Sequence, residues 1–286
     1  MAEHVRIVEV CPRDGLQNES RLVPLSDKIM LVDLLSGCGF ERIEVTSFVS
    51  PKWVPQLADA AEVMAGIARR PGTRYTALTP NLEGYQRAKA ARADEVAVFA
   101  AASEAFSRQN INCGIAESIE RFRPLAAAAG SDGIPLRGYV SCVTHCPYEG
   151  KVMPAQVASV ARALSALGCH EISLGDTIGE AQPDDTKAML IAVLDEVPVD
   201  KLAGHFHDTR SRALANIAVC LDHGLRVFDA SAGGLGGCPY APGAAGNVAT
   251  EAVARFLEAR GLATGLDMEA LDRAAAFARS LKGSHP

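Results

Sequence analysis

The sequence predicts an α/β protein of the closed parallel (β/α)8 barrel class, the TIM barrel. Short runs rich in β-branched residues recur along the chain, and each is followed by Gly, Pro, Ser or Asp and then by a longer amphipathic Ala/Leu-rich segment. Eight such units fill most of the 286 residues. The count and the length favour a barrel over the alternative, an open doubly wound sheet.

The predicted elements alternate from one end of the chain to the other. The strands are residues 6–10, 42–45, 75–78, 95–99, 136–140, 171–174, 202–207 and 227–230. Apolar residues recur at helical spacing in the intervening segments 27–35, 155–167 and 214–222. No linker-like stretch interrupts residues 6–265, so we expect one catalytic domain over residues 1–286, with a barrel core at about 5–265 and an added C-terminal helix at 268–281.

The composition is that of a globular protein without the excess of positive charge that nucleic-acid binding needs. Hydrophobic residues make up 48% and charged residues 22% of the chain, which excludes disorder as its main state. The 28 Lys and Arg residues stand against 34 Asp and Glu residues, giving a net charge of −6. Nucleic acid is therefore not an expected partner, and an anionic ligand must meet positive charge placed locally.

The cysteines and the lack of long apolar segments indicate a protein of a reducing compartment. The eight cysteines are scattered, and the chain begins without the apolar stretch of a secretion signal. No run approaches the roughly 18 apolar residues needed to cross a bilayer. We expect free thiols, no membrane partner and a cytoplasmic location, although trimming of a longer organellar precursor would leave the same chain.

Polar residues cluster where the predicted strands end. In a barrel of this class the active site lies at the carboxyl ends of the strands, so side chains at those ends converge on one mouth. The residues at these positions are Arg13, Asp14, Glu44, Ser47, Tyr139, Ser141, Asp176, His205 and His207.

His205 and His207 form the local pattern that most strongly indicates a metal site. Residues two apart on a strand face the same side, so both imidazoles can enter the mouth together. Two histidines hydrogen-bonded in a polar core are the alternative to a metal site. Asp14 and Asn247 would add oxygen ligands, and a nitrogen and oxygen set suits Mg²⁺ or Mn²⁺ better than zinc, which stays open.

A glycine-dense segment, AGGLGGCPYAPG at residues 232–243, follows the last strand and carries Cys238. The chain has no GxGxxG after the first strand and no Walker lysine, so nucleotide binding is weakly supported. The glycines could form a tight turn or a phosphate cradle. The other interpretation is a lid that brings the Cys238 thiol over a substrate, as an acid or a nucleophile.

Motifs in the same order over almost the whole chain resemble those of the 3-hydroxy-3-methylglutaryl-CoA lyase family. They are VEVCPRDGLQNE, IEVTSFVSPKWVPQ, LTPNLEGY, RGYVSC, CPYEGK, EISLGDTIG, HFHDT and GGLGGCPYAPGAAGN. The resemblance implies a metal-dependent (β/α)8 barrel that splits 3-hydroxy-3-methylglutaryl-CoA into acetyl-CoA and acetoacetate, in leucine degradation and ketone-body metabolism. It also implies a homodimer.

The resemblance further implies roles for the residues that match its motifs. Asp14, His205, His207 and Asn247 correspond to the metal ligands, in agreement with the set deduced above. Asp176 corresponds to the residue that transfers the hydroxyl proton, whereas an Asp after a strand can also simply cap the next helix.

Two further groups would serve the enolate of acetyl-CoA that cleavage leaves. Arg13 is implied to stabilise its oxygen and Cys238 to protonate its carbon, with a plain salt bridge and an incidental thiol as the structural alternatives. Glu9 and Glu251 are implied to position Arg13, while Glu44 lines the mouth. Glu9 could equally be a buried barrel charge with a neighbour as its partner.

The remaining predictions concern the acyl-CoA. Tyr139 and Ser47 are expected near the substrate, and Lys52 and Asn110 lie in segments where a CoA chain could run.

One departure from the family pattern bears on the acyl group. The family usually continues His-Asp-Thr with Tyr-Gly-Gln, but this chain has Arg210 and Arg212, which oppose the dipole at a helix start. We expect a compensating anion from substrate or protein. Three alternatives stay open: a related substrate such as citramalyl-CoA or a longer 3-substituted glutaryl-CoA, an acyl-CoA-condensing synthase, and a non-catalytic metal-stabilised binding module.

Overall fold

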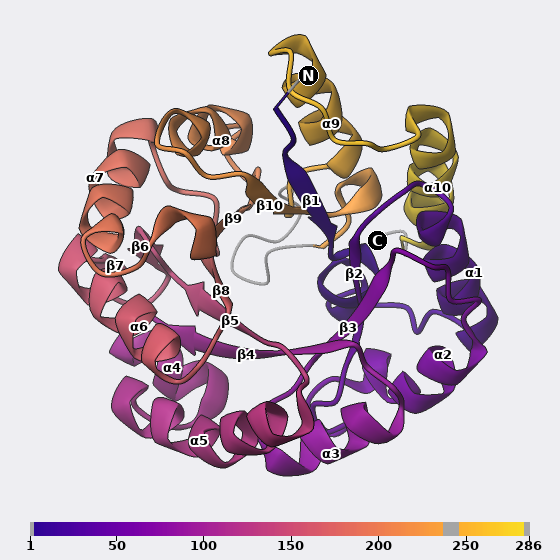
Figure 1. Cartoon of the computed structure of the whole chain (residues 1–286), viewed down its shortest axis with the longest axis horizontal. Helices are drawn as coiled ribbons and strands as arrows, with labels where there is room; N and C mark the ends of the chain where they lie inside the picture. Colours follow the sequence, from indigo (N-terminus) through magenta and orange to yellow (C-terminus); the bar gives the residue numbers. More distant parts are fainter. Residues whose placement is uncertain (1–2, 237–245, 283–286) are drawn as a thin grey trace.

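The computed structural model of this chain describes residues 3–236 and 246–282 and forms a closed parallel barrel (Figure 1). Going round the barrel, the strand order is β1-β10-β9-β8-β5-β4-β3-β2, and β1 closes it by pairing with both β10 and β2. All eight predicted strands are confirmed. Their bounds are β1 Arg6–Glu9, β2 Arg42–Ser47, β3 Arg74–Leu78, β4 Glu95–Ala101, β5 Leu136–Ser141, β8 Glu171–Asp176, β9 Leu202–Phe206 and β10 Val227–Ala230.

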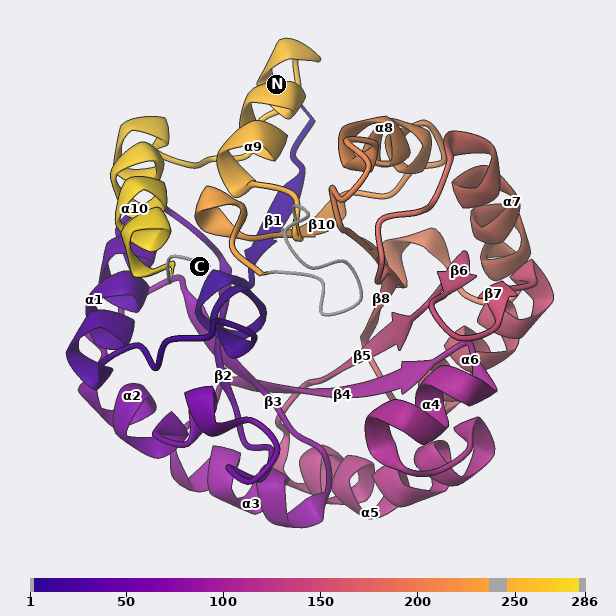
Figure 2. The same ribbon diagram turned by 180° about the vertical axis from the view of Figure 1, so that it is seen from behind.

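Helices surround the barrel as an outer ring in both views (Figures 1 and 2). They are α1 Leu25–Ser36, α2 Ala60–Gly66, α3 Leu82–Ala90, α4 Glu104–Ile111, α5 Ile115–Asp132, α6 Pro154–Ala166, α7 Pro183–Leu194, α8 Ala213–Asp222, α9 Thr250–Ala259 and α10 Met268–Leu281. The added C-terminal helix α10 packs beside α1. A short antiparallel hairpin of β6 (His145–Cys146) and β7 (Gly150–Lys151) was not predicted.

Local sequence signals set several helix boundaries. α3 begins after Asn81, whose side-chain oxygen accepts a hydrogen bond of 2.9 Å from the backbone N–H of Gly84. α10 begins in the same way after Asp267, which accepts from the N–H of Ala270 at 3.0 Å. α5 ends at Gly133, whose φ of +68° lies in the left-handed region that glycine adopts without strain.

Charged side chains occupy part of the barrel interior. Arg42 pairs with Glu95 at 3.4 Å and with Glu171 at 2.7 Å. Arg137 pairs with the same Glu171 at 2.8 Å and with Asp229 at 2.8 Å. All five side chains are buried, so each depends on its partners for charge compensation. The chain of ion pairs ends at Asp229, which lies beside His205 in the register of β10 and β9.

The described residues include neither a membrane-spanning helix nor a disulfide. None of the helices described is both long and apolar enough to span a membrane. The seven cysteines that the structure describes are buried and unpaired, which confirms free thiols for that set. Cys238 lies outside the described residues.

Candidate active site

A five-residue π-helix, Cys11–Gly15, follows β1 and carries two of the predicted site residues over the barrel mouth. The carbonyl of Val10 accepts hydrogen bonds from the backbone N–H groups of Arg13 at 3.2 Å, Asp14 at 2.8 Å and Gly15 at 3.2 Å. Single π turns of this kind are frequent at functional sites. Gly15 permits close packing here, because a Cβ would lie 2.8 Å from the Ser231 hydroxyl oxygen.

Asp14, His205 and His207 form a cluster whose ligand atoms all lie within 4.8 Å of one another. His205 Nε2 is 4.0 Å from Asp14 Oδ2, and the two imidazole centroids are 5.4 Å apart. Asn247 joins them, since its Nδ2 donates to Asp14 Oδ2 at 2.7 Å. The structure therefore brings together the four residues predicted as metal ligands, and the cluster is the one group of its kind in residues 3–236 and 246–282.

The protonation states of Asp14 and His207 suit a cation. Burial alone would raise the pKa of Asp14, but the charges of Arg13, His205 and His207 outweigh it and hold that pKa at about 2. Burial, reinforced by His205, lowers the pKa of His207 to about 4, so this imidazole is neutral at neutral pH. Burial also lowers the pKa of His205, but Asp229 and Asp14 outweigh it and leave that pKa raised.

The residues fit a divalent cation held by nitrogen and oxygen atoms. The donor set contains a carboxylate and two imidazoles, with an amide beside them. His207 Nδ1 is buried and has no hydrogen-bond partner among the residues described. A buried polar atom without a hydrogen-bond partner costs free energy, so the His207 ring is explained best by a ligand at the site.

Arg13 lies beside the cluster and is held by carboxylates. Its Nε donates to Glu44 Oε2 at 2.6 Å, and its Nη1 contacts Asp14 Oδ1 closely. Glu44 Oε1 in turn accepts from the Tyr139 hydroxyl at 3.2 Å. Burial lowers the pKa of Arg13, but the charges of Asp14 and Glu44 outweigh burial and leave that pKa raised, so Arg13 stays a permanent cation.

Glu9 is buried and ties three segments together instead of contacting Arg13. Its Oε1 accepts from the N–H of Cys11 at 2.8 Å and of Ala232 at 3.0 Å, and its Oε2 accepts from the Thr250 hydroxyl at 2.8 Å. Burial raises the pKa of Glu9 to about 7 despite these three donors. Glu9 has no direct contact with the Arg13 side chain among the described residues, but it holds the π-helix that carries Arg13 to the 3₁₀ turn at Ala232–Gly234 and to the start of α9. Its role in positioning Arg13 stays a prediction.

Glu251 also lies apart from Arg13. Its carboxylate accepts from the Gly233 N–H at 3.0 Å and pairs with Arg279 of α10 at 2.7 Å. It makes no hydrogen bond or ion pair with Arg13 among the described residues, so its role in positioning Arg13 stays a prediction. Among the described residues, the carboxylates that pair with the Arg13 side chain are Glu44 and Asp14.

Asp176 is the last residue of β8 and is buried. Its Oδ2 accepts from the Ala181 N–H at 3.1 Å, and its Oδ1 from the Thr144 hydroxyl at 3.3 Å. Its backbone carbonyl accepts from the N–H of His207 at 3.4 Å, which places it next to the cluster. Burial raises its pKa to about 6, offset in part by these donors. α7 is capped by Gln182 and Asp185, so Asp176 does not cap that helix.

Sequence reasoning missed Asp229 and Arg137. Asp229 Oδ2 accepts from the Ser173 hydroxyl at 2.7 Å and lies 3.2 Å from His205 Nδ1. Both missed residues are charged side chains inside short strands whose other members are largely apolar. A charge in the middle of such a strand is a signal that could have identified them.

Three predicted substrate residues have other contacts or are exposed. Ser47 ends β2, and its hydroxyl oxygen accepts from the Val49 N–H at 3.1 Å. The Lys52 ammonium lies 5.6 Å from the centroid of the Trp53 ring, and Asn110 is exposed in the last turn of α4. Lys52 and Asn110 lie in segments that follow the carboxyl ends of β2 and β4, on the side of the barrel where the cluster lies.

The departure at Arg210 has a local explanation. Arg210 Nε donates to Glu180 Oε1 at 2.9 Å, so the compensating anion expected for this charge is supplied by the protein. The ion pair joins the segment after β8 to the segment after β9. Gly179 packs in the same place, because a Cβ there would lie 2.8 Å from Thr209 and 2.9 Å from the carbonyl oxygen of His207.

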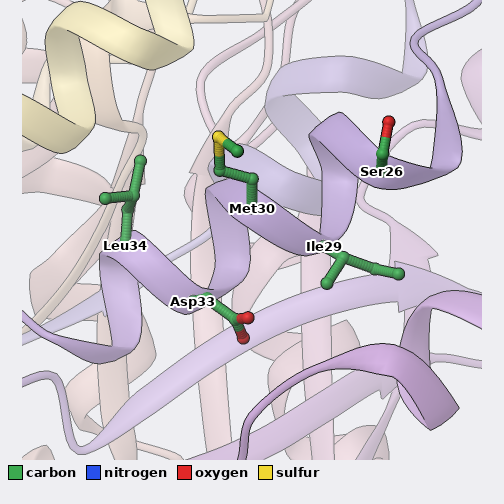
Figure 3. A pocket seen from close by; sticks show the side chains of 5 residues that line it. All are labelled: Ser26, Ile29, Met30, Asp33 and Leu34. Atoms are coloured by element: carbon green, nitrogen blue, oxygen red, sulfur yellow. The ribbon is translucent and has the colours of Figure 1, made fainter.

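A cavity on the outer ring offers no comparable chemistry. It is lined by Ser26, Ile29, Met30, Asp33 and Leu34 along α1 (Figure 3). Its one carboxylate already accepts a hydrogen bond of 2.7 Å from the Ala68 N–H. The candidate active site is therefore the cluster at the mouth.

Gly236 makes the metal cluster dependent on the glycine-dense segment. Its φ is +110°, and a Cβ would collide with the Asn247 amide and lie 3.3 Å from the Asp14 carbonyl oxygen. We expect Gly236→Ala to weaken Mn²⁺ binding about 10–100-fold, the range for lost support of metal ligands. Gly72→Ala is the matched control, because Gly72 has a φ of +90° with nothing within 4 Å. Equal Mn²⁺ affinities for the two variants would contradict this role.

The fold and the site together define an enzyme of the (β/α)8 barrel class with a candidate metal site at the carboxyl ends of its strands. The HMGL-like family model matches residues 4–277. The chain belongs to the HMGL-like family, and it is a lyase.

Relatives and solved structures agree over nearly the full length. The chain is 57% identical to the 3-hydroxy-3-isohexenylglutaryl-CoA/hydroxy-methylglutaryl-CoA lyase of Pseudomonas aeruginosa, covering 95% of this chain and 90% of that one. The crystal structure of the HMG-CoA lyase from Brucella melitensis matches with a TM-score of 0.98 and 62% identity, covering 98% of this chain and 99% of that one. An HMG-CoA lyase from A. baumannii in complex with coenzyme A and 3-methylmalate matches with a TM-score of 0.92 and 39% identity, covering 98% and 92%.

Proposed function

We propose that this chain cleaves 3-hydroxy-3-methylglutaryl-CoA to acetyl-CoA and acetoacetate with the help of Mg²⁺ or Mn²⁺, as one catalytic domain over residues 1–286. The observation that carries the proposal is the cluster of Asp14, His205 and His207 beside the buried Arg13 at the barrel mouth. The match to the HMGL-like family over residues 4–277 supports the same reaction.

Asp14, His205, His207 and Asn247 would hold the cation. When bound there, a divalent cation supplies a Lewis acid that lowers the pKa of the substrate's tertiary hydroxyl. The protein keeps two of these ligands in their binding forms: Asp14 is ionised, with a pKa of about 2, and His207 is neutral.

Asp176 accepts the hydroxyl proton in this proposal. Its pKa of about 6 leaves it ionised at neutral pH yet more basic than an ordinary aspartate. As the proton leaves, the hydroxyl oxygen becomes the ketone oxygen of acetoacetate and the carbon–carbon bond breaks. The bonding electrons pass to the other fragment as the enolate of acetyl-CoA.

Arg13 stabilises the negative charge that develops on the thioester oxygen. It is a permanent cation held in place by Glu44, so little reorganisation is needed at the moment of reaction. Cys238 then protonates the enolate carbon, which becomes the methyl group of acetyl-CoA. In support, the segment with Cys238 is flanked by Gly236 and Asn247, joined by a hydrogen bond of 3.2 Å.

Asp176→Asn is expected to lower kcat/KM by about 10²–10⁴-fold with little change in unfolding temperature, because the amide is isosteric but cannot take the proton. In the wild type the ionised fraction of Asp176 falls as the pH drops through about 6. kcat/KM at saturating Mg²⁺ should therefore fall about tenfold per pH unit below that value. Undiminished turnover combined with a lower unfolding temperature would assign Asp176 a structural role instead.

The proposal is tested with purified protein, Mg²⁺ or Mn²⁺, and a panel of 3-hydroxy-acyl-CoA thioesters, following acetyl-CoA release with Cys238→Ala in parallel. We expect cleavage of 3-hydroxy-3-methylglutaryl-CoA and a much slower Cys238→Ala. Failure to cleave any thioester would refute the function, and an equally fast Cys238→Ala would refute the proton donor. Citramalyl-CoA and the condensing synthase are not favoured, because the compared proteins carry HMG-CoA lyase names. The P. aeruginosa relative is also named for 3-hydroxy-3-isohexenylglutaryl-CoA, a longer 3-substituted glutaryl-CoA, so that thioester belongs in the panel.

We further propose that the CoA chain runs past Lys52 and Asn110, with Tyr139 and Ser47 nearer the acyl end. The coenzyme A in the A. baumannii structure supports an acyl-CoA ligand for this chain.

We also propose that the protein is a cytoplasmic homodimer that serves leucine degradation and ketone-body metabolism. The seven unpaired thiols among the described cysteines support a reducing compartment.

A further inference from the structure

Arg137 in β5 is the largest fully buried side chain among the described residues. Its Nε donates to Glu171 at 2.8 Å, and its Nη1 donates to the Tyr139 hydroxyl oxygen at 2.8 Å. Asp229 receives a fork from the same guanidinium, with Nη2 to Oδ1 at 2.8 Å and Nη1 to Oδ2 at 3.2 Å. The guanidinium thus bonds to three partners in fixed directions, and two of them lead to the active site.

The first branch runs to a metal ligand. Asp229 Oδ2 lies 3.2 Å from His205 Nδ1 and also accepts from the Ser173 hydroxyl at 2.7 Å. With Nδ1 committed to Asp229, His205 presents Nε2 toward Asp14, 4.0 Å away. A carboxylate behind a ligating histidine fixes its ring orientation and raises its basicity.

The second branch runs to the residue assigned to the developing negative charge. The Tyr139 hydroxyl donates to Glu44 Oε1 at 3.2 Å, and Glu44 Oε2 accepts from Arg13 Nε at 2.6 Å. Both guanidinium groups also lie over the Tyr139 ring, at 4.9 Å from its centroid for Arg137 and 5.6 Å for Arg13. The position of Arg13 therefore depends on the hydroxyl that Arg137 holds.

We propose that Arg137 is a positioning residue that orients both halves of the active site from inside the barrel, His205 through Asp229 and Arg13 through Tyr139 and Glu44. The inference rests on the proposed function, since it concerns the same site. Arginine suits this position because its planar fork of donors can serve several acceptors at fixed angles, which the single ammonium of lysine cannot.

The ion pairs on the other side of Arg137 supply a control. Glu95 is as buried as Asp229 but bonds to Arg42 at 3.4 Å and to His170 at 3.1 Å, away from both branches. Glu95→Gln therefore disturbs the buried charges without touching either branch. It separates positioning from a general loss of barrel stability.

The test measures Mn²⁺ affinity by titration calorimetry, steady-state kinetics and the unfolding temperature for three variants and the control. Asp229→Asn should weaken Mn²⁺ binding about 10–100-fold, because an amide cannot hold the His205 tautomer. Tyr139→Phe should keep Mn²⁺ affinity within about twofold and lower kcat about five- to tenfold through one lost hydrogen bond. Arg137→Lys should show both effects, and Glu95→Gln should lower only the unfolding temperature.

The outcomes separate this inference from the proposed function. If Asp229→Asn and Tyr139→Phe fold, bind Mn²⁺ and turn over like the wild type, the positioning role is overturned while the function stands. The role is also overturned if Glu95→Gln weakens Mn²⁺ binding as much as Asp229→Asn. A wild type that neither binds Mn²⁺ nor cleaves the substrate overturns the proposed function, and the positioning role with it. If Arg137→Lys fails to fold, the two near-isosteric variants decide the matter.

Discussion

Asp14→Asn is expected to lower kcat by about 10³-fold or more, corresponding to at least about 4 kcal/mol of lost transition-state stabilisation. Asp14 supplies the one carboxylate of the candidate metal cluster, and its pKa of about 2 keeps it ionised at neutral pH. The amide removes that charge from the cation. It also leaves Arg13 with Glu44 as its remaining carboxylate partner.

The measurement for Asp14→Asn combines Mn²⁺ affinity with turnover at saturating metal. Asp132→Asn is the control, because Asp132 pairs with Lys89 on the outer ring, at 2.7 Å. We expect the control to keep Mn²⁺ affinity and kcat within about twofold, as exposed pairs contribute little. If Asp14→Asn bound Mn²⁺ and turned over like the control, the cluster would not be the metal site.

Arg13→Lys is expected to lower kcat by about 10²–10³-fold while KM changes little, the range for loss of a preorganised donor at a developing oxyanion. Lysine keeps the positive charge but has a single ammonium. It cannot bond to Glu44 and Asp14 as Arg13 does and also face the thioester oxygen in a fixed direction.

The comparison of kcat with stability decides between two roles for Arg13. A large fall in kcat with an unchanged unfolding temperature supports stabilisation of the enolate oxygen. An unchanged kcat with a lower unfolding temperature would identify Arg13 as a structural salt bridge, the alternative that the sequence left open.

The fold was predictable because the β-branched runs and amphipathic segments that indicate it are local and recur eight times along the chain. All eight strands were predicted from β-branched runs, and α10 has the predicted bounds, Met268–Leu281. The largest differences are at strand ends: β8 continues two residues beyond the predicted end, to Asp176. Pairing with β9 extends it there, since Gly175 pairs with His205 and Asp176 with Phe206, and such pairing leaves no mark on the sequence of β8 itself.

The grouping of the candidate metal cluster was predictable from topology and spacing. A parallel barrel collects the carboxyl ends of its strands at one mouth, and the i, i+2 spacing of His205 and His207 turns both rings the same way. This is why Asp14, from the first strand, and Asn247, from beyond the last, meet them.

The supporting contacts were not predictable, because they join residues far apart in the chain. Arg137 and Asp229 are 92 positions apart, and nothing local indicates that they meet inside the barrel. The same holds for Glu9 and Glu251, most of whose partners also lie far along the chain. Glu9 accepts from the N–H groups of Cys11 and Ala232 and from the Thr250 hydroxyl. Glu251 accepts from the N–H of Gly233.

The most direct test of the central claim is metal removal and reconstitution during cleavage of 3-hydroxy-3-methylglutaryl-CoA. The protein is stripped with a chelator, and acetoacetate and acetyl-CoA are quantified as Mn²⁺ or Mg²⁺ is added back. We expect no cleavage without the cation, and activity restored in proportion to the metal bound, with both products formed in equal amounts. Full activity in the stripped protein, or products other than these two, would contradict the account.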